Sequence, residues 1–401
     1  MRKTSFVAAV LAAALLGGAV ALLGAKVSGL AQGGTSTVYV PKDVRGLGTD
    51  PNEAVSASAR PLLGNGFDPS RIYSARSAGV VTLYAFFDKA DQHAAQGSGF
   101  VVTDSGYILT SAHVITDAGD AARTTAASRV FVGFKGGDRV KADIVGWDVY
   151  DDVGLLRVSP SAHKLAPVPF GDSARVQPGD PVAAMGSPFG NEDSIAVGVV
   201  SAVHRSIMSL TSIYKVVDAI QIDAPITHGN SGGPLFDARG QVIGINAQIR
   251  TDSGTAEGVG FAVPINAAQR SMRQLASIGH VVYAYLGVTT ENLTPTLARH
   301  LGYETGRGAL VASVRHGSPA AKAGVRGGNR DEIFNGEPVT VGGDLIVAID
   351  GAQVRSADDV VRHVAAKLPG EFTALTIIHG KGRRVIRVRL GSRPVAPETS
   401  R

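Results

Sequence analysis

The chain has 401 residues, of which 44% are hydrophobic and 18% charged, so it is long enough for two or more folded domains. Its net charge of +5 is small for this length and gives no sign of nucleic-acid binding. The sequence contains no cysteine, which excludes disulfides, thiolate catalysis and cysteine metal sites, and its 50 glycines favour short strands and turns over long helices.

The N-terminus predicts export. Arg2 and Lys3 precede an uncharged, mostly apolar run from Phe6 to Ala25. A run of about 20 residues is enough to cross a bilayer and long for the core of a cleaved signal peptide. We therefore favour an uncleaved membrane anchor within residues 1–31, with a signal peptide cleaved after Ala31 as the alternative. Both interpretations place the rest of the chain outside the cytoplasm.

Composition and periodicity divide the remaining chain. Residues 32–70, rich in Gly, Ser, Pro and Asp, are expected to be a flexible linker. Short apolar segments separated by Gly, Asp and Pro over 71–266 predict an all-β sandwich or barrel domain. Residues 267–282 show helical spacing and are expected to link it to a smaller domain over 283–395, followed by a tail over 396–401. In the smaller domain "SPAAKAGV" and "SADDVVRHVAAKL" are predicted helices, and "RRVIRVR" is predicted to be a half-exposed strand.

The stretch "ITHGNSGGPLFD" suggests a tight turn that presents the hydroxyl of Ser231 among glycines. A serine is a poor nucleophile unless a base, usually a histidine oriented by a carboxylate, takes its proton. His113 follows the apolar strand "ILTSA" and is the candidate base, and Asp152 precedes the apolar strand "VGLLRV" and is the candidate carboxylate. Asp148 and Asp151 compete for this role but are interpreted as a turn residue and a solvated neighbour.

The chain order His, Asp, Ser separates the unrelated folds that carry such a triad. Subtilisin-like enzymes run Asp, His, Ser, and α/β-hydrolases run Ser, Asp, His, so only the chymotrypsin-type order fits. The sequence resembles trypsin-fold serine proteases, and more closely the HtrA/Deg family, whose members carry a C-terminal PDZ domain. The resemblance rests on "GSGFVVTDSGYILTSAHVI", "WDVYDDVGLLRV", "GSPFG", "HGNSGGPLFDARGQVIGINAQI" and "GVGFAVPI", in the order of the family.

This resemblance implies a mainly β fold, with two six-stranded barrels of the trypsin type followed by one PDZ domain. It also implies roles for the site residues. His113 would be general base and then general acid, Asp152 would orient it, and Ser231 would attack the peptide carbonyl. The turn of Gly229, Asn230 and Ser231 would form the oxyanion hole through the N–H groups of the first and last. Because Asn230 replaces the aspartate of digestive relatives, activation by propeptide cleavage is not expected.

The resemblance places Ile226, Ala247 and Ile249 in the walls of the specificity pocket. None of these residues carries a charge, so the pocket is expected to prefer small or medium apolar side chains such as Val, Ala, Ile or Leu. Such residues become exposed when proteins unfold. No cofactor or metal is expected, and the sequence has no Walker-type loop that would couple the reaction to ATP.

The segment "YLGV" resembles the loop of a PDZ domain that binds the terminal carboxylate of a peptide. It consists of Tyr285, Leu286, Gly287 and Val288. A bound peptide would then add as a strand to the sheet edge. One departure from the family is an insertion at about 329–341, expected at the surface and able to cover or extend the peptide groove.

The predicted function is therefore an ATP-independent, extracytoplasmic serine endopeptidase that cleaves unfolded or damaged exported proteins. The family often forms trimers, so a homo-oligomer is expected, with exported polypeptides, peptide C-termini and the membrane as its other partners. Two alternatives stay open. One is a selective signalling protease that is gated by its PDZ domain, and the other is a catalytically idle PDZ scaffold or chaperone.

Overall fold

The computed structural model describes residues 67–88, 94–117, 124–187, 194–209, 211–212, 215–226, 229–247 and 259–394. The predicted N-terminal segment over 1–31, the predicted tail over 396–401 and Ile249 therefore lie outside the described residues. Within those ranges, no helix has the length and apolar character that crossing a bilayer requires.

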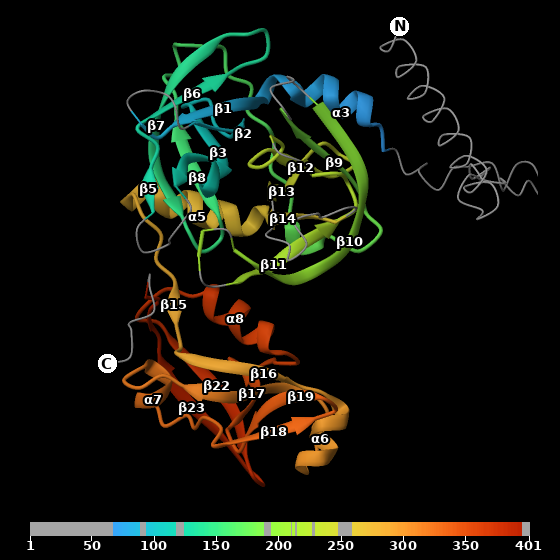
Figure 1. Ribbon diagram of the computed structural model, residues 1–401, viewed down its shortest axis with the longest axis vertical. Helices are drawn as coiled ribbons and strands as arrows, with labels where there is room; N and C mark the ends of the chain where they lie inside the picture. Colours follow the sequence, from blue (N-terminus) through green and yellow to red (C-terminus); the bar gives the residue numbers. More distant parts are fainter. Residues whose placement is uncertain are drawn as a thin grey trace, which may run out of the picture. The chain divides into compact units, whose positions relative to one another are not determined.

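The first barrel closes with its strands in the order β1-β2-β3-β8-β7-β6 (Figure 1). The strands are β1 (Val80–Phe86), β2 (Ala94–Val101), β3 (Tyr107–Ser111), β6 (Arg129–Gly133), β7 (Arg139–Asp148) and β8 (Val153–Arg157). Five short elements lie before β1 or between β3 and β6: α3 (Pro69–Arg76), η1 (Ser77–Gly79), α4 (Ala112–Ile115), β4 (Thr116–Asp117) and β5 (Thr125–Ala126). The strands β4 and β5 pair with each other. Ser111 at the end of β3 pairs with Val153 at the start of β8, which brings the turn after β3 next to the turn before β8.

The second barrel closes in the order β10-β11-β14-β13-β12-β9. The short 3-10 helix η2 (Ser173–Arg175) precedes it, and the strands are β9 (Pro181–Gly186), β10 (Ser194–Met208), β11 (Lys215–Ile222), β12 (Pro234–Phe236), β13 (Val242–Ala247) and β14 (Gly260–Pro264). The glycine-rich turn with Ser231 immediately precedes β12. The predicted mainly β fold with two six-stranded barrels is thus confirmed.

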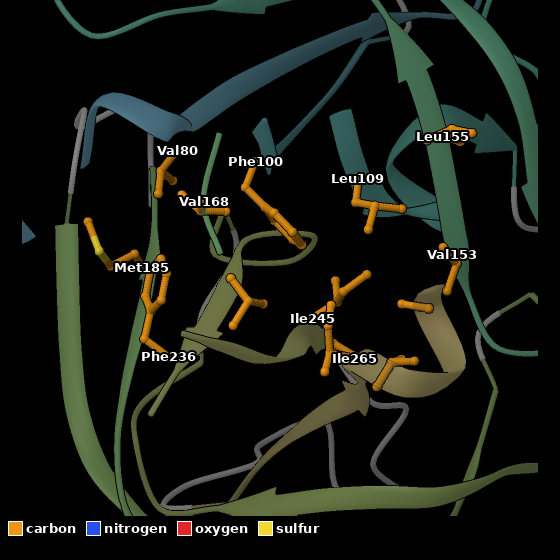
Figure 2. Packing of buried hydrophobic residues seen from close by; sticks show 14 of the residues in the cluster. Val80, Phe100, Leu109, Val153, Leu155, Val168, Met185, Phe236, Ile245 and Ile265 are labelled. Carbon is orange, nitrogen blue, oxygen red and sulfur yellow. The ribbon is translucent and has the colours of Figure 1, made fainter. Parts of the chain in front are cut away.

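One buried cluster joins the two barrels. Figure 2 shows Phe100 and Leu109 of the first barrel directed toward Ile245 of the second, and all three are 0% exposed. Each such side chain contributes roughly 1.5–3 kcal/mol when it is removed from water. The same cluster includes Val153 of β8 and Phe236 of β12, the strands that follow Asp152 and Ser231, so the shared core fixes the turns of the triad candidates relative to one another.

Helix α5 (Ile265–Ile278) follows β14 and belongs to the same core. It buries Ile265, Ala268, Ser271 and Leu275, whose spacing places them on one face. The helix ends at Gly279, which adopts a left-handed φ of 78° and whose N–H closes the last turn on the Leu275 carbonyl.

The C-terminal domain is built on a sheet with the order β16-β17-β20-β22-β23, with β21 paired to β20. Its strands are β15 (Ala284–Tyr285), β16 (Val288–Leu293), β17 (Gly308–Val314), β20 (Leu345–Ile349), β21 (Ala352–Gln353), β22 (Phe372–His379), β23 (Gly382–Arg389) and β24 (Gly391–Ser392). Its helices are α6 (Pro295–Leu301), α7 (Pro319–Lys322) and α8 (Ala357–Ala365), the last two in the stretches predicted to be helical. Helix α8 begins with a capping box between Ser356 and Asp359.

The insertion forms a β-hairpin of β18 (Arg330–Phe334) and β19 (Glu337–Val341). Asn335 and Gly336 connect the strands with φ of 52° and 87°, the left-handed pair that a tight hairpin turn requires. Phe334 and Val339 pack with Leu297 of α6 in a small apolar cluster. The hairpin is therefore anchored beside α6.

Candidate active site

His113 and Asp152 meet where the turn after β3 lies beside the turn before β8. The Nδ1 atom of His113 is 2.7 Å from the Oδ2 atom of Asp152, and the backbone N–H of His113 donates to Oδ1 at 2.9 Å. Asp152 is buried, and its backbone has a left-handed φ of 54°, an uncommon conformation for a residue other than glycine. Both carboxylate oxygens thus face one histidine and leave its Nε2 atom available to a nucleophile.

The surroundings of His113 act on its pKa in opposite directions. Burial is the largest influence and by itself lowers the pKa, because it disfavours the charged ring. The charge of Asp152 and its hydrogen bond act against burial, and the net result is a pKa above the ordinary 6.5. Asp152 therefore makes His113 a stronger base than an isolated imidazole.

Ser231 lies in a turn in which two nearby positions, 229 and 232, adopt backbone conformations that favour glycine. Gly232 has a φ of 84°, and a Cβ atom there would lie 2.3 Å from both the Ser98 carbonyl oxygen and the Thr110 Oγ1 atom. Gly229 has a φ of 103°. These contacts explain why the turn is rich in glycine, as the sequence suggested.

The backbone N–H groups of this turn divide into two kinds. Those of Gly232 and Gly233 donate to the carbonyls of Asn246 and Asn230 at 2.8 and 3.0 Å. Among the residues that the structure describes, the N–H groups of Gly229 and Ser231 have no acceptor. Two uncommitted donors beside a serine hydroxyl are what an oxyanion hole requires.

The Ser231 Oγ atom is buried and makes no hydrogen bond to the described residues, His113 included. Ser231 still lies near His113. Gly97 lies between them: a Cβ atom on it would touch Val114, the residue after His113, on one side and the Ser231 carbonyl oxygen on the other. Catalytic hydrogen bonds are often long in ligand-free enzymes and tighten when substrate binds. The geometry therefore brings His113 and Asp152 into contact and leaves Ser231 close by.

Comparison with known proteins decides the family. The family described as trypsin-like peptidase domain matches residues 97–245, and the PDZ domain family matches residues 284–390. A putative serine protease of Synechocystis, HhoB, is 36% identical over 306 residues, which cover 74% of this chain and 67% of the relative. The chain belongs to the HtrA family of serine proteases.

Two further comparisons show the extent of the likeness. A probable periplasmic serine endoprotease of Brucella suis, DegP-like, is 37% identical over 300 residues, or 75% of this chain and 53% of the relative. This HtrA chain therefore spans about half the length of such curated relatives. The solved structure of the HtrA-type protease AlgW with a tripeptide superposes with a TM-score of 0.67 at 30% identity and covers 82% of this chain and 98% of that one.

Sequence reasoning missed the role of Ser98 in this HtrA chain. The Ser98 hydroxyl on β2 donates to the Gly229 carbonyl at 2.5 Å and accepts the Ser187 N–H at 2.9 Å, and the Ser98 N–H donates to the Ser231 carbonyl at 2.8 Å. A residue of the first barrel therefore holds the turn of Ser231, which belongs to the second. The motif "GSGF" was the available signal.

The candidate specificity pocket is described only in part, because Ile249 lies outside the described residues. Ala247 ends β13 and is buried, and Ile226 is partly buried. Gly260 on β14 is a residue that sequence reasoning missed: a Cβ atom there would lie 2.8 Å from the Ile226 Cγ1 atom. The described walls are apolar, and a larger side chain at Gly260 would narrow the space beside Ile226.

The candidate peptide groove lies between β16 and α8. Its lining includes the loop predicted to bind a carboxylate, Tyr285 to Val288, and the apolar side of α8 formed by Val360, Val361 and Val364. Gly287 has a φ of 84°, and a Cβ atom there would lie 2.3 Å from the Ser318 Cβ atom. Described hairpin residues of the insertion are not among those that line the groove.

The interpretation of Asp151 as a solvated neighbour is wrong. Its exposed fraction is 8%, and that of Asp148 is 1%. Asp148 does accept the backbone N–H of Tyr150 at 2.9 Å, as a turn residue would, but it also accepts the Ser271 hydroxyl of α5 at 2.6 Å. Both aspartates are buried because α5 and the segment after it cover this turn, which local sequence does not reveal.

Proposed function

We propose that this chain is an extracytoplasmic serine endopeptidase that acts through His113, Asp152 and Ser231 and cleaves unfolded polypeptides after small or medium apolar residues. The single observation that carries the proposal is the 2.7 Å contact between His113 Nδ1 and Asp152 Oδ2, which holds a base beside the glycine-rich turn of Ser231. Membership of a serine protease family supports the same reaction.

The proposed reaction follows from these positions. Asp152 holds the proton on His113 Nδ1, so that Nε2 accepts the proton of the Ser231 hydroxyl as its oxygen attacks the substrate carbonyl. The N–H groups of Gly229 and Ser231 stabilise the negative oxygen that develops. His113 then gives the proton to the leaving amine, and a water molecule, activated by the same base, hydrolyses the acyl-enzyme.

The proposed specificity rests on the apolar pocket. Ile226 and Ala247 offer no charge that would pair with Lys or Arg at the cleaved bond, and Ile249 adds a third apolar side chain in sequence. Burying an unpaired charge there would cost several kcal/mol, roughly, whereas an apolar side chain gains from burial. Unfolded proteins expose such side chains and are the proposed substrates.

The proposed role of the PDZ domain is to bind peptide C-termini. A peptide that adds to β16 would place its carboxylate at the loop from Tyr285 to Val288 and its last side chain against Val360 and Val364. Exported polypeptides are thus proposed as partners through two sites. The apolar N-terminal segment supports membrane attachment or export, and a homo-oligomer is proposed from the family.

The first experiment compares the full chain with its Ser231→Ala variant on fluorescent unfolded casein, with and without peptides that end in apolar residues. Loss of a triad serine is expected to lower turnover by about a million-fold. Cleavage that disappears in the variant supports the peptidase, and cleavage only with peptide supports the selective signalling protease. If neither chain cleaves casein but both bind it, the peptidase proposal is wrong and the scaffold remains.

A glycine substitution tests the peptide groove separately. Gly287→Ala adds a Cβ atom 2.3 Å from Ser318 at a φ of 84°, so the carboxylate-binding loop must shift. Affinity for an apolar-tailed peptide, measured by fluorescence anisotropy, is expected to fall roughly tenfold or more. Gly336→Ala is the matched control, because it has a similar φ of 87° in the hairpin turn with open space around it. Equal losses in both variants would exclude this groove.

A further inference from the structure

A buried cluster of two carboxylates and one phenol lies directly beside the triad and is not used by the reaction proposed above. It consists of Asp148 at the end of β7, Asp151 in the turn before β8, and Tyr283 in the segment between α5 and β15. Their exposed fractions are 1%, 8% and 3%. Three ionisable groups so far from water require an internal arrangement of protons and charges that satisfies them.

The Tyr283 hydroxyl joins the two carboxylates. Its oxygen lies 2.5 Å from Asp148 Oδ2 and 2.7 Å from Asp151 Oδ2. The Ser271 hydroxyl also reaches Asp148 Oδ2, at 2.6 Å, and the Arg270 guanidinium lies 3.3 Å from Asp151 Oδ2. One carboxylate is thus paired with a cation, while the other meets only neutral donors.

A count of hydrogens shows that this cluster is one proton short when both carboxylates are ionised. The phenol has a single hydrogen, but its oxygen makes two short contacts with carboxylate oxygens. A proton on Asp148 completes the set, because Asp148 then donates to Tyr283 and Tyr283 donates to Asp151. Burial, followed by the charge of Asp151, raises the pKa of Asp148 to about 6, which agrees with this placement.

Other charged groups face the cluster from each element around it. Arg270 of α5 balances Asp151, and the Arg393 guanidinium lies 5.2 Å from the Tyr150 ring centre and 5.1 Å from that of Tyr283. Burial raises the pKa of Tyr283 well above 10, so the phenol keeps its hydrogen at ordinary pH. The proton that the cluster gains or loses is therefore the one on the carboxylate pair.

The cluster is connected to the triad candidates through the backbone of the turn before β8. Asp151 directly precedes Asp152, whose carboxylate holds His113 and whose carbonyl accepts the Ala112 N–H at 3.1 Å. At its other end, the Tyr283 carbonyl accepts the Arg393 N–H at 2.8 Å. A shift of the turn from Asp148 to Asp152 would therefore move the carboxylate that orients the base.

We propose that Asp148, Asp151 and Tyr283 form a proton-dependent positioning cluster, which holds the Asp152 turn in place while the carboxylate pair shares a proton and loosens it when that proton is lost to solvent. The proposal rests on the function proposed above, because it acts through His113 and Asp152. Tyr283 and Asp148 are positioning residues in this scheme and touch no substrate.

The test uses the full chain carrying Ser231→Ala and two spectroscopic readouts that need no catalysis. Infrared difference spectra between pH 5 and pH 8 are expected to show the carbonyl band of one protonated buried carboxyl, which disappears as the pH rises and is absent from Asp148→Asn. At pH 8, the low-field NMR signal of the His113 Nδ1 proton is expected to be broader in the parent than in Asp148→Asn, whose amide supplies the missing hydrogen permanently. Asp143→Asn, exposed on the same strand, is the matched control and should behave like the parent chain.

Activity provides the third readout, in chains that keep Ser231. At pH 8, Asp148→Asn is expected to raise kcat for a short peptide at least about threefold with KM unchanged, because small errors of catalytic geometry are costly. Tyr283→Phe should lower kcat at every pH, while Tyr150→Phe should not. A carboxyl band that does not titrate, or an His113 signal independent of the Asp148 proton, would overturn the proposal. Absence of cleavage in every chain, with both spectroscopic signals as expected, would instead overturn the proposed peptidase function.

Discussion

Asp148 and Asp152 stand at the two ends of one short turn, are buried to a similar extent, and are in opposite chemical situations. Asp152 is 4% exposed and faces a histidine that becomes cationic, so both of its oxygens serve one partner. Asp148 is 1% exposed and faces a second carboxylate and neutral hydroxyls. Burial, and then the charge of the neighbouring Asp151, raise the pKa of Asp148, whereas the carboxylate of Asp152 contacts the His113 ring.

The largest expected effect comes from replacing Asp152, the carboxylate that contacts His113. Asp152→Asn removes the acceptor that holds the His113 Nδ1 proton and leaves the ring in the wrong tautomer. In comparable triads this change lowers kcat about ten-thousand-fold. Peptide hydrolysis by the purified full chain measures it. A loss below about tenfold would mean that another group orients His113.

Neutralising Asp148 should change the stability of the fold, in addition to the change of kcat expected at pH 8. The ordinary pKa of an aspartate is 3.8, and burial with the charge of Asp151 raises that of Asp148 to about 6 in the folded chain. Its contribution to stability is therefore complete below pH 3.8 and is lost as the pH rises through about 6. The loss amounts to about 3 kcal/mol. In Asp148→Asn this part of the pH dependence should disappear.

Urea unfolding at pH 4 and pH 7 measures this difference in the inactive Ser231→Ala background, which avoids self-digestion. Asp143→Asn serves as the control for a carboxylate on the same strand. Equal pH dependence in Asp148→Asn and its parent would contradict the raised pKa.

A smaller effect is expected in the pH profile of the reaction. The pKa of His113 is above 6.5 in the folded chain, so the acid limb of kcat/KM should have its midpoint above 6.5, with activity rising as the ring loses its proton. Asp152→Asn removes the influences that raise this pKa and leaves burial, which lowers it. The acid limb of the residual kcat/KM should therefore move to lower pH. An acid limb that stays in place would show that a group other than His113 causes it.

The smallest expected effect is that of Ser271→Ala. The Ser271 hydroxyl stabilises the ionised form of Asp148 through the 2.6 Å hydrogen bond, so its removal should raise the pKa of Asp148 further. The folded state should lose about 1–2 kcal/mol near pH 7, where Asp148 is ionised, and less at pH 4. Unfolding curves at the two pH values check this, and an equal loss at both would show that the hydroxyl contributes only to packing.

The sequence predicted the parts of the site that depend on local pattern. His113 after an apolar strand, Asp152 before one and Ser231 among glycines all follow from short motifs, and the two-barrel fold follows from the resemblance that these motifs carry. The pairing of Ser111 with Val153 then brings the first two together.

The remainder depends on contacts between distant segments. Asp151 has the local pattern of a surface turn residue, and only the cover provided by α5 and Tyr283 buries it. Ser98 and Gly260 act through space on turns that lie far from them in the chain. No periodicity encodes such contacts, because each needs both barrels in place before it exists.

The hydrogen bonds of Ser98 have a consequence for the order of events during synthesis. Its hydroxyl comes from the first barrel, whereas the groups it holds, the Gly229 carbonyl and the Ser187 N–H, come from the second. The first barrel emerges first during synthesis. The turn of Ser231 therefore lacks the hydrogen bonds from Ser98 until the second barrel has closed and packed against the first. A chain whose second barrel is still incomplete therefore lacks the hydrogen bonds that hold the turn of Ser231.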